Sequence, residues 1–158
     1  MADLSPLDEK LAEVLGLAQA AQDATTKVAG MEDAEDFADL LGRMGEEAAE
    51  MERRTDALVD TLEGRKTAIR EMAAETKGEV KKMMQAYLAD EEEALDGFEF
   101  LFMAEAGELG HWEIVKAMSD ELGDAAAGDL AEWAVAVQHT HVAGVRESSL
   151  KLAVDEVS

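Results

Sequence analysis

Residues 101–141 read LFMAEAGELGHWEIVKAMSDELGDAAAGDLAEWAVAVQHTH, and these residues are the most informative about the fold. Apolar side chains recur every three or four residues on both sides of Gly123, as they do along helices that pack against one another. The pattern stops at Gly123 and resumes after Asp124. The stretch therefore predicts two long helices, over about 91–122 and 125–156, that form an antiparallel hairpin.

A second pair of helices is predicted upstream, over about 6–29 and 34–63. Each carries an apolar stripe with the seven-residue rhythm of bundle helices, and Pro6 suits the first helical position. Between the two pairs, residues 65–88 hold a weaker pattern and many of the 14 basic residues, which indicates a solvated helical crossover. We therefore expect an all-α protein with a single domain over residues 1–158, an antiparallel four-helix bundle of two hairpins joined by a long crossover.

The composition limits the functions that this chain can have. With 37 acidic and 14 basic residues the formal net charge is −23 at pH 7, so nucleic acid and anionic membranes should be repelled. No apolar run approaches the length of a membrane span. The chain has no cysteine, which excludes thiol catalysis and thiolate metal sites and fits a cytoplasmic protein. The acidity fits a surface adapted to high salt, with a funnel for cations and general solubility as the alternatives.

Two short patterns within the hairpin are typical of metal ligands. Glu108 stands three residues before His111, and Gln138 stands three residues before His141, so each pair shares one helix face. The two histidines lie near the middle of their apolar stripes and, in an antiparallel hairpin, at a similar depth. We expect them to converge in one core layer with the two flanking oxygen ligands, and Glu47 is the best candidate from the first hairpin. Iron, manganese or zinc would suit such a set, whereas no motif for an organic cofactor is present.

Residues 111–114, His-Trp-Glu-Ile, are similar to the His-Tyr-Glu-Ile element of the YciF-type stress proteins, and two hairpins with one crossover resemble the ferritin-like superfamily. The resemblance implies a ferritin-like bundle that serves metal handling or oxidative stress. A complete di-iron site takes carboxylates from all four helices. Here the core stripe of residues 6–29 has none, and Gln138 stands where a bridging glutamate is expected. We therefore expect a mononuclear or degenerate site between the third and fourth helices, without ferroxidase activity.

The same side chains fit a second interpretation, a metal-free helical bundle that acts as a structural or partner-binding module. A buried histidine is more often a hydrogen-bonded core residue than a ligand, because an unpaired polar group in a core costs about 1–3 kcal/mol. In this interpretation Glu108, His111, Gln138 and His141 form an internal hydrogen-bond network without metal. His139 lies on the opposite side of its helix and is expected at the surface.

A second apolar face on the third helix predicts self-association. Phe98, Phe102 and Leu109 share this face, which is distinct from the core stripe. One bundle seam cannot bury both faces, and the lysines of the crossover make it a poor apolar cover. We therefore expect a homodimer in which the third helices meet near Phe102, whereas the sequence identifies no other protein partner.

Overall fold

The structure, a computed structural model, describes residues 3–158 and is all-α, as expected. Within residues 3–158 the chain forms no β-strand. The elements in chain order are α1 (Pro6–Ala29), the short 3₁₀ helix η1 (Glu35–Phe37), α2 (Ala38–Asp60), α3 (Lys66–Leu88), α4 (Ala94–Leu122) and α5 (Ala125–Glu156).

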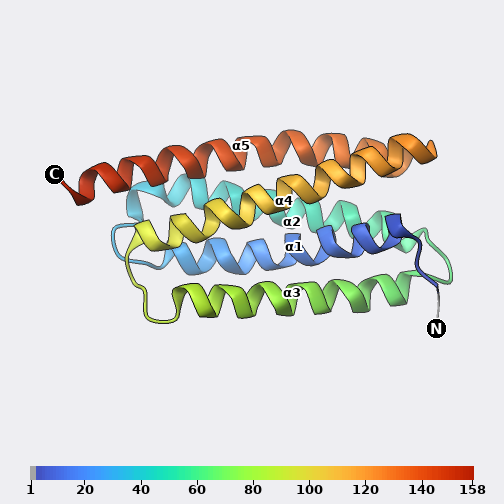
Figure 1. The fold of residues 1–158 in the computed structure, drawn as a ribbon, viewed down its shortest axis with the longest axis horizontal. Coiled ribbons are helices and arrows are strands. Elements are labelled where there is room, and N and C mark those ends of the chain that lie inside the picture. The colour runs from blue at the N-terminus through green and yellow to red at the C-terminus, as the bar shows by residue number, and fades with distance from the viewer. Residues whose placement is uncertain (1–2) are drawn as a thin grey trace.

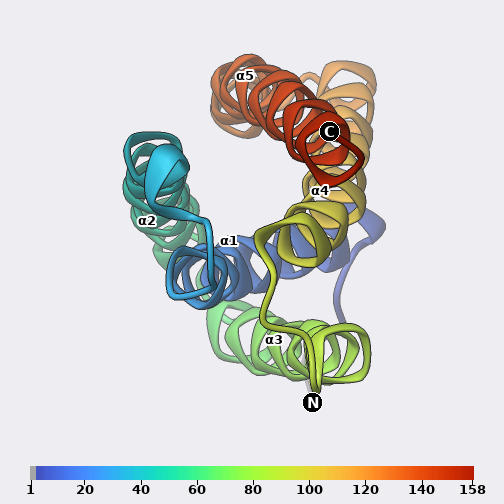
Figure 2. The same ribbon diagram turned by 90° about the vertical axis from the view of Figure 1, so that its left-hand side faces the viewer.

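Two antiparallel hairpins and one crossover make up the fold (Figure 1). α1 and α2 form the first hairpin, and α4 and α5 form the second. α3 connects the two hairpins in the chain and runs back along the length of the molecule, so that α2 and α4 point in the same direction. Viewed along the helices, α1, α2, α4 and α5 surround a common interior, and α3 lies outside against α1 (Figure 2). α2 and α5 contact each other much less than the other neighbouring pairs do, so the two hairpins are joined mainly through α1 and α4.

The helix ends follow from local signals in the sequence. The Ser5 hydroxyl accepts a hydrogen bond from the Asp8 N–H at 3.1 Å, and the Asp8 carboxylate accepts one from the Ser5 N–H at 3.0 Å, which caps α1. Gly123 takes a left-handed φ of 69° and ends α4. Asp124 then caps α5 by accepting from the Ala127 N–H at 3.1 Å. The hairpin turn therefore lies where the sequence pattern stops.

Two helices begin later than their patterns predict. α2 begins at Ala38 rather than near residue 34, and α4 begins at Ala94 rather than near residue 91. The connections that precede these helices pair with each other: the Glu32 N–H donates to the Glu92 carbonyl at 2.8 Å, and the Glu32 carbonyl accepts from the Ala94 N–H at 3.1 Å. Pairing between distant segments competes with helix formation there, and helical periodicity alone cannot reveal it.

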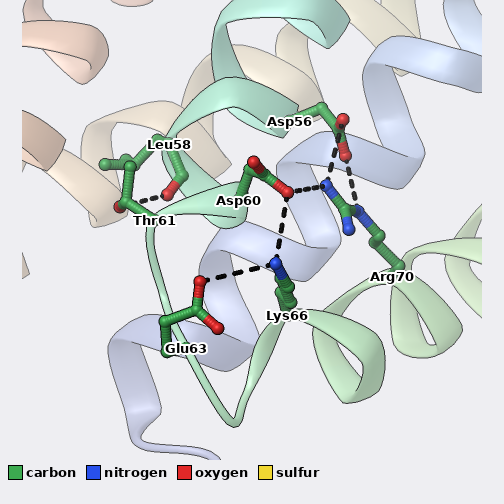
Figure 3. A network of polar contacts seen from close by, with 7 residues as sticks. All are labelled: Asp56, Leu58, Asp60, Thr61, Glu63, Lys66 and Arg70. Atoms are coloured by element: carbon green, nitrogen blue, oxygen red, sulfur yellow. Dashed lines mark hydrogen bonds and ion pairs between the residues drawn. The ribbon is translucent and has the colours of Figure 1, made fainter.

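Polar contacts hold the turn between α2 and α3 (Figure 3). Arg70 lies 2.9 Å from an oxygen of Asp56 and 3.2 Å from one of Asp60. Lys66 lies 3.6 Å from Asp60 and 3.5 Å from Glu63. Basic residues of the crossover therefore pair with acidic residues of α2 and of the turn. All these groups face solvent, so each pair contributes little to stability by itself.

The crossover α3 is docked on α1 along one face. Ile69 and Ala73 of α3 are buried with Leu15 of α1. A Cβ atom at Gly16 would lie 2.4 Å from the Ala73 carbonyl oxygen, which is closer than real contacts allow. α1 and α3 can therefore approach because residue 16 has no side chain. The expectation of a solvated crossover holds only for its outer face.

The bundle interior consists of two apolar clusters that lie at different heights along the helices. One contains Val28, Met44, Phe98 and Leu101, and the other contains Leu11, Met51, Trp112 and Val115. Between the two clusters, α2, α4 and α5 each contribute polar side chains. We call this level the polar layer, defined by Glu47, Glu105, Glu108, Gln138 and His141.

The predicted second apolar face of α4 is largely covered within the chain. Phe98 is fully buried, and its ring centre lies 5.0 Å from that of Phe37. Phe102 packs at the edge of the same cluster, and Leu109 is half-buried. The expectation that Phe98 needs a separate cover is therefore wrong, because the segment before α2 supplies it. The homodimer itself stays a prediction.

Candidate functional site

The polar layer gathers ionisable side chains from three helices. His141 of α5 is at its centre, with its imidazole between two carboxylates. Its Nε2 lies 3.1 Å from Oε1 of Glu47 on α2, and its Nδ1 lies 3.4 Å from Oε1 of Glu105 on α4. The side chains of His141 and Glu105 are 1% and 3% exposed, whereas that of Glu47 is 32% exposed. The layer thus runs from a fully buried carboxylate to one at the edge of the bundle.

Gln138 holds Glu105 in this arrangement. Its Nε2 donates to Glu105 Oε2 at 3.0 Å, and it also lies 3.4 Å from the Glu105 backbone carbonyl oxygen. Gln138 is itself buried and lies one turn before His141 on α5. The two α5 side chains therefore contact both oxygens of the same carboxylate, which fixes its orientation.

Two buried polar atoms of the layer have no hydrogen-bond partner: Glu108 Oε1 and His141 Nδ1. The 3.4 Å contact of His141 Nδ1 with Glu105 is an ion pair without hydrogen-bond alignment. An unsatisfied buried polar group costs about 1–3 kcal/mol, and such groups in folded proteins call for an explanation. The layer therefore has unused capacity to bind a proton, a water molecule or an ion.

Burial and close charges displace the pKa values of the layer. Burial, and then the negative charge of Glu105, raise the pKa of Glu108 well above its ordinary value. Burial alone would raise the pKa of Glu105, but its close contacts with His141 and Glu108 outweigh burial and lower that pKa. Burial alone would lower the pKa of His141, but its contacts with Glu105 and then Glu47 outweigh it and raise that pKa. The layer thus favours a protonated Glu108 and a protonated His141 beside ionised Glu105.

His111 does not join the polar layer. Its side chain is 39% exposed, its Nδ1 contacts the Gly107 carbonyl oxygen at 2.8 Å, and its Nε2 lies 3.3 Å from Glu13 of α1. The prediction that His111 occupies the middle of the core face is therefore wrong. The fully buried Trp112 takes that position, and the large apolar ring gains more from burial than the imidazole does.

Glu105 is the residue that sequence reasoning missed. The buried positions of α4 around the layer are Leu101, Glu105, Glu108, Trp112 and Val115, which follow one helix face. With the turn at Gly123 and Asp124, the antiparallel register places Glu105, rather than His111, opposite His141. The sequence does contain a signal for Glu105: it stands three residues before Glu108, on the helix face that carries Trp112, and this spacing indicates a second carboxylate on the buried face. Four of the five predicted site residues do lie in the polar layer: Glu47, Glu108, Gln138 and His141. His139 is exposed, as expected.

The layer is arranged as hydrogen-bonded and ion-paired side chains. Within residues 3–158, no three histidine, aspartate or glutamate side chains surround a common point as they would around a metal ion. Among the same residues, no helix is both long and apolar enough to cross a membrane. A search of protein-family models, curated proteins and solved structures gives no match to this chain.

Proposed function

We propose that the polar layer is a binding site for one divalent transition-metal ion, with Glu47, Glu105 and His141 as ligands and the carboxyl group of Glu108 beside them. The observation that carries the proposal is the convergence of four ionisable side chains from three helices in one layer, three of them almost completely buried. Carboxylate oxygen and imidazole nitrogen suit iron, manganese and zinc. We further propose that the bundle is ferritin-like and serves metal handling.

Protons would leave the layer when the ion enters. A metal ligand must be deprotonated, so His141 has to be neutral and Glu108 has to be ionised if it takes part. An ion of charge two that replaces both protons leaves the net charge of the layer unchanged. To bind the ion, the side chains of Glu47 and Glu105 would rotate, and the helices would not need to move. Gln138 would act as a positioning residue, because its amide holds Glu105.

The absence of carboxylates on the neighbouring face of α1 favours a site for a single metal ion. The side chains of α1 that lie beside Glu105 and Glu108 are apolar: Leu17, Ala20, Ala21 and Ala24. A second metal ion would need carboxylates from this side, as di-iron bundles have. We therefore favour a mononuclear site without ferroxidase activity.

A metal-free structural module is the second candidate, and one observation favours it. Both ring nitrogens of His141 already face carboxylates, and within the described residues no metal-like group of ligands is formed. In that case the polar layer fixes the register of the two hairpins, since a buried polar network is satisfied in only one alignment. The two candidate functions therefore differ in whether the polar layer binds a metal ion.

Metal binding by matched histidine variants tests the proposal. Untagged protein freed of metal is dialysed against iron(II), manganese(II) or zinc(II) in roughly 1 M salt, where the screening length falls to about 3 Å and loose binding to the acidic surface is suppressed. We expect about one ion per chain in the wild type and in the control His111→Gln, and loss of binding in His141→Gln. Absence of binding for all three metals, or equal loss in both variants, would contradict the proposal.

A further inference from the structure

One face of α4 is apolar and yet exposed. Met103 and Ile114 on this face are 46% and 42% exposed. The small residues between and after them recur at the same three- or four-residue spacing, so all of them share one side of the helix. We call this side the outer face of α4, defined by Met103, Ala106, Gly110, Ile114 and Ala117. Exposed apolar residues that gather on one surface are typical of a contact with another molecule.

The middle of the outer face carries no charge, although the protein is strongly acidic. Glu99 and Glu113 are exposed and lie about 20 Å apart along α4. The acidic side chains between them, Glu105 and Glu108, are buried, and residues 100–112 include no lysine or arginine. A cationic partner would be attracted to the carboxylates elsewhere on the surface. A second copy of the chain, which also carries a net charge of −23, is repelled least at an uncharged face.

The side chains of the outer face complement those of a second copy in size. When two α4 helices pack antiparallel with Gly110 on the two-fold axis, the numbers of opposite residues have a constant sum. Met103 of one copy then lies opposite Ala117 of the other, and Ile114 lies opposite Ala106. Each large side chain therefore meets a small one. A two-fold dimer requires a self-complementary surface of this kind.

Gly110 allows the two helices to approach each other closely. A Cβ atom at Gly110 would have no atom within 4 Å, so packing within the chain does not require a glycine there. Glycine inside a helix is less stable than alanine. The distance between two packed helices depends on the side chains at their contact, and it is short where these are small. A second helix that crosses at Gly110 therefore gives this glycine a structural role.

We propose that the protein forms a two-fold symmetric dimer through the outer faces of two antiparallel α4 helices, which cross at Gly110. Met83 and Tyr87 of α3, which are 52% and 56% exposed, extend the apolar surface beside α4. Met83 lines a pocket with Met103, and the ring centre of Tyr87 lies 6.0 Å from that of Phe100. A contact that includes both helices is closer to the roughly 800 Å² per partner that stable interfaces bury.

This dimer differs from the one that the sequence predicts, and it does not depend on metal binding. The sequence places the contact at Phe98, Phe102 and Leu109, of which Phe98 is fully buried within its own chain. The outer face lies on another side of the same helix. The wild type and His141→Gln should therefore dimerise alike, so the dimer and the metal site can fail separately.

Sedimentation equilibrium of two glutamate variants tests the dimer. Gly110→Glu brings two negative charges together on the two-fold axis. Gly42→Glu on α2 is the control, because Gly42 is also an exposed helical glycine whose Cβ would have no atom within 4 Å. Glutamate is a better helix former than glycine, so both variants should keep the fold.

The masses are measured at micromolar concentration in roughly 1 M salt, where the screening length is about 3 Å and repulsion between copies is weak. We expect twice the chain mass for the wild type and for Gly42→Glu, and the mass of a single chain for Gly110→Glu. A wild type that stays at the single mass, or equal masses for the two variants, would overturn the proposal.

Cysteine cross-linking tests the antiparallel register, and the chain has no cysteine of its own. In Gly110→Cys the two sulfur atoms meet on the axis. In Ile114→Cys they lie about 12 Å apart along the helices, which is beyond the reach of a disulfide. We expect a covalent dimer of Gly110→Cys on mild oxidation and none of Ile114→Cys. Equal cross-linking of both variants, or cross-linking of Ile114→Cys alone, would exclude this register.

Discussion

At the scale of single residues, Glu108 is a carboxyl group whose ionisation in the folded protein is strongly disfavoured. It is buried beside Glu105, and its pKa is raised well above the ordinary value of 4.5 by burial and then by that neighbouring charge. The folded chain therefore holds this proton more tightly than the unfolded chain does. By linkage, the stabilising contribution of the protonated form is fully present below pH 4.5 and is lost as the pH rises through the folded pKa.

Replacing Glu108 by glutamine should therefore flatten the pH dependence of stability. The variant cannot ionise, whereas the wild type in its metal-free form should lose stability as the pH rises above 4.5. The measurement is the unfolding free energy of both proteins in denaturant, from about pH 5 to about pH 9. Parallel curves for the two proteins would mean that Glu108 does not hold a proton in the folded state.

The sequence predicts only some of the residues of the candidate site. Glu108, Gln138 and His141 could be found because polar side chains interrupt otherwise apolar helical stripes. His111 is expected on the wrong face and Glu105 is not predicted at all, because α4 is apolar around much of its circumference and periodicity alone does not fix its rotation. Tertiary packing decides that rotation, since the whole side chain of Trp112 is buried.

At the scale of helices, most of the fold follows from local signals. Ser5 and Asp8 fix the start of α1, and Gly123 with Asp124 fixes the turn between α4 and α5. The docking of α3 on α1 could not be foreseen, because it depends on a contact between Gly16 and Ala73 that lie far apart in the sequence. A glycine within a helix is a weak signal by itself.

Alanine at Gly16 should weaken the contact between α1 and α3. Its Cβ would overlap the Ala73 carbonyl oxygen, a backbone atom that can move only if the helices separate. We expect Gly16→Ala to destabilise the protein by roughly 1–3 kcal/mol. Gly78→Ala on α3 is the control: its Cβ meets no atom within 4 Å, and alanine should stabilise that helix by about 0.5–1 kcal/mol. Equal denaturation midpoints for the two variants would argue against the close approach.

At the scale of the whole molecule, the net charge of −23 dominates the behaviour expected in solution. Repulsion among the carboxylates disfavours the compact state, and the surface ion pairs, such as that of Arg70 with Asp56, are too few and too exposed to offset it. Salt screens charges that lie more than a screening length apart, and this length is about 10 Å at 0.1 M and about 3 Å at 1 M.

Thermal stability should accordingly rise with salt. We expect the Tm of the metal-free protein to increase between roughly 0.1 M and 1 M sodium chloride, with potassium chloride giving a similar increase because screening depends on ionic strength. Differential scanning calorimetry measures both series. A Tm that is unchanged or falls with salt would mean that attractive pairs, rather than repulsion, control the stability of this acidic surface.

The most direct test of the polar layer as a metal site counts the protons that leave when the ion enters. Zinc(II) is added to the metal-free protein in weakly buffered high salt with a pH indicator, and bound zinc and released protons are measured together. Binding at Glu105 and His141, with Glu108 ionised, predicts that protons are released as the ion binds, and that no such release occurs in His141→Gln. Zinc uptake without proton release, or release that persists in His141→Gln, would contradict the account.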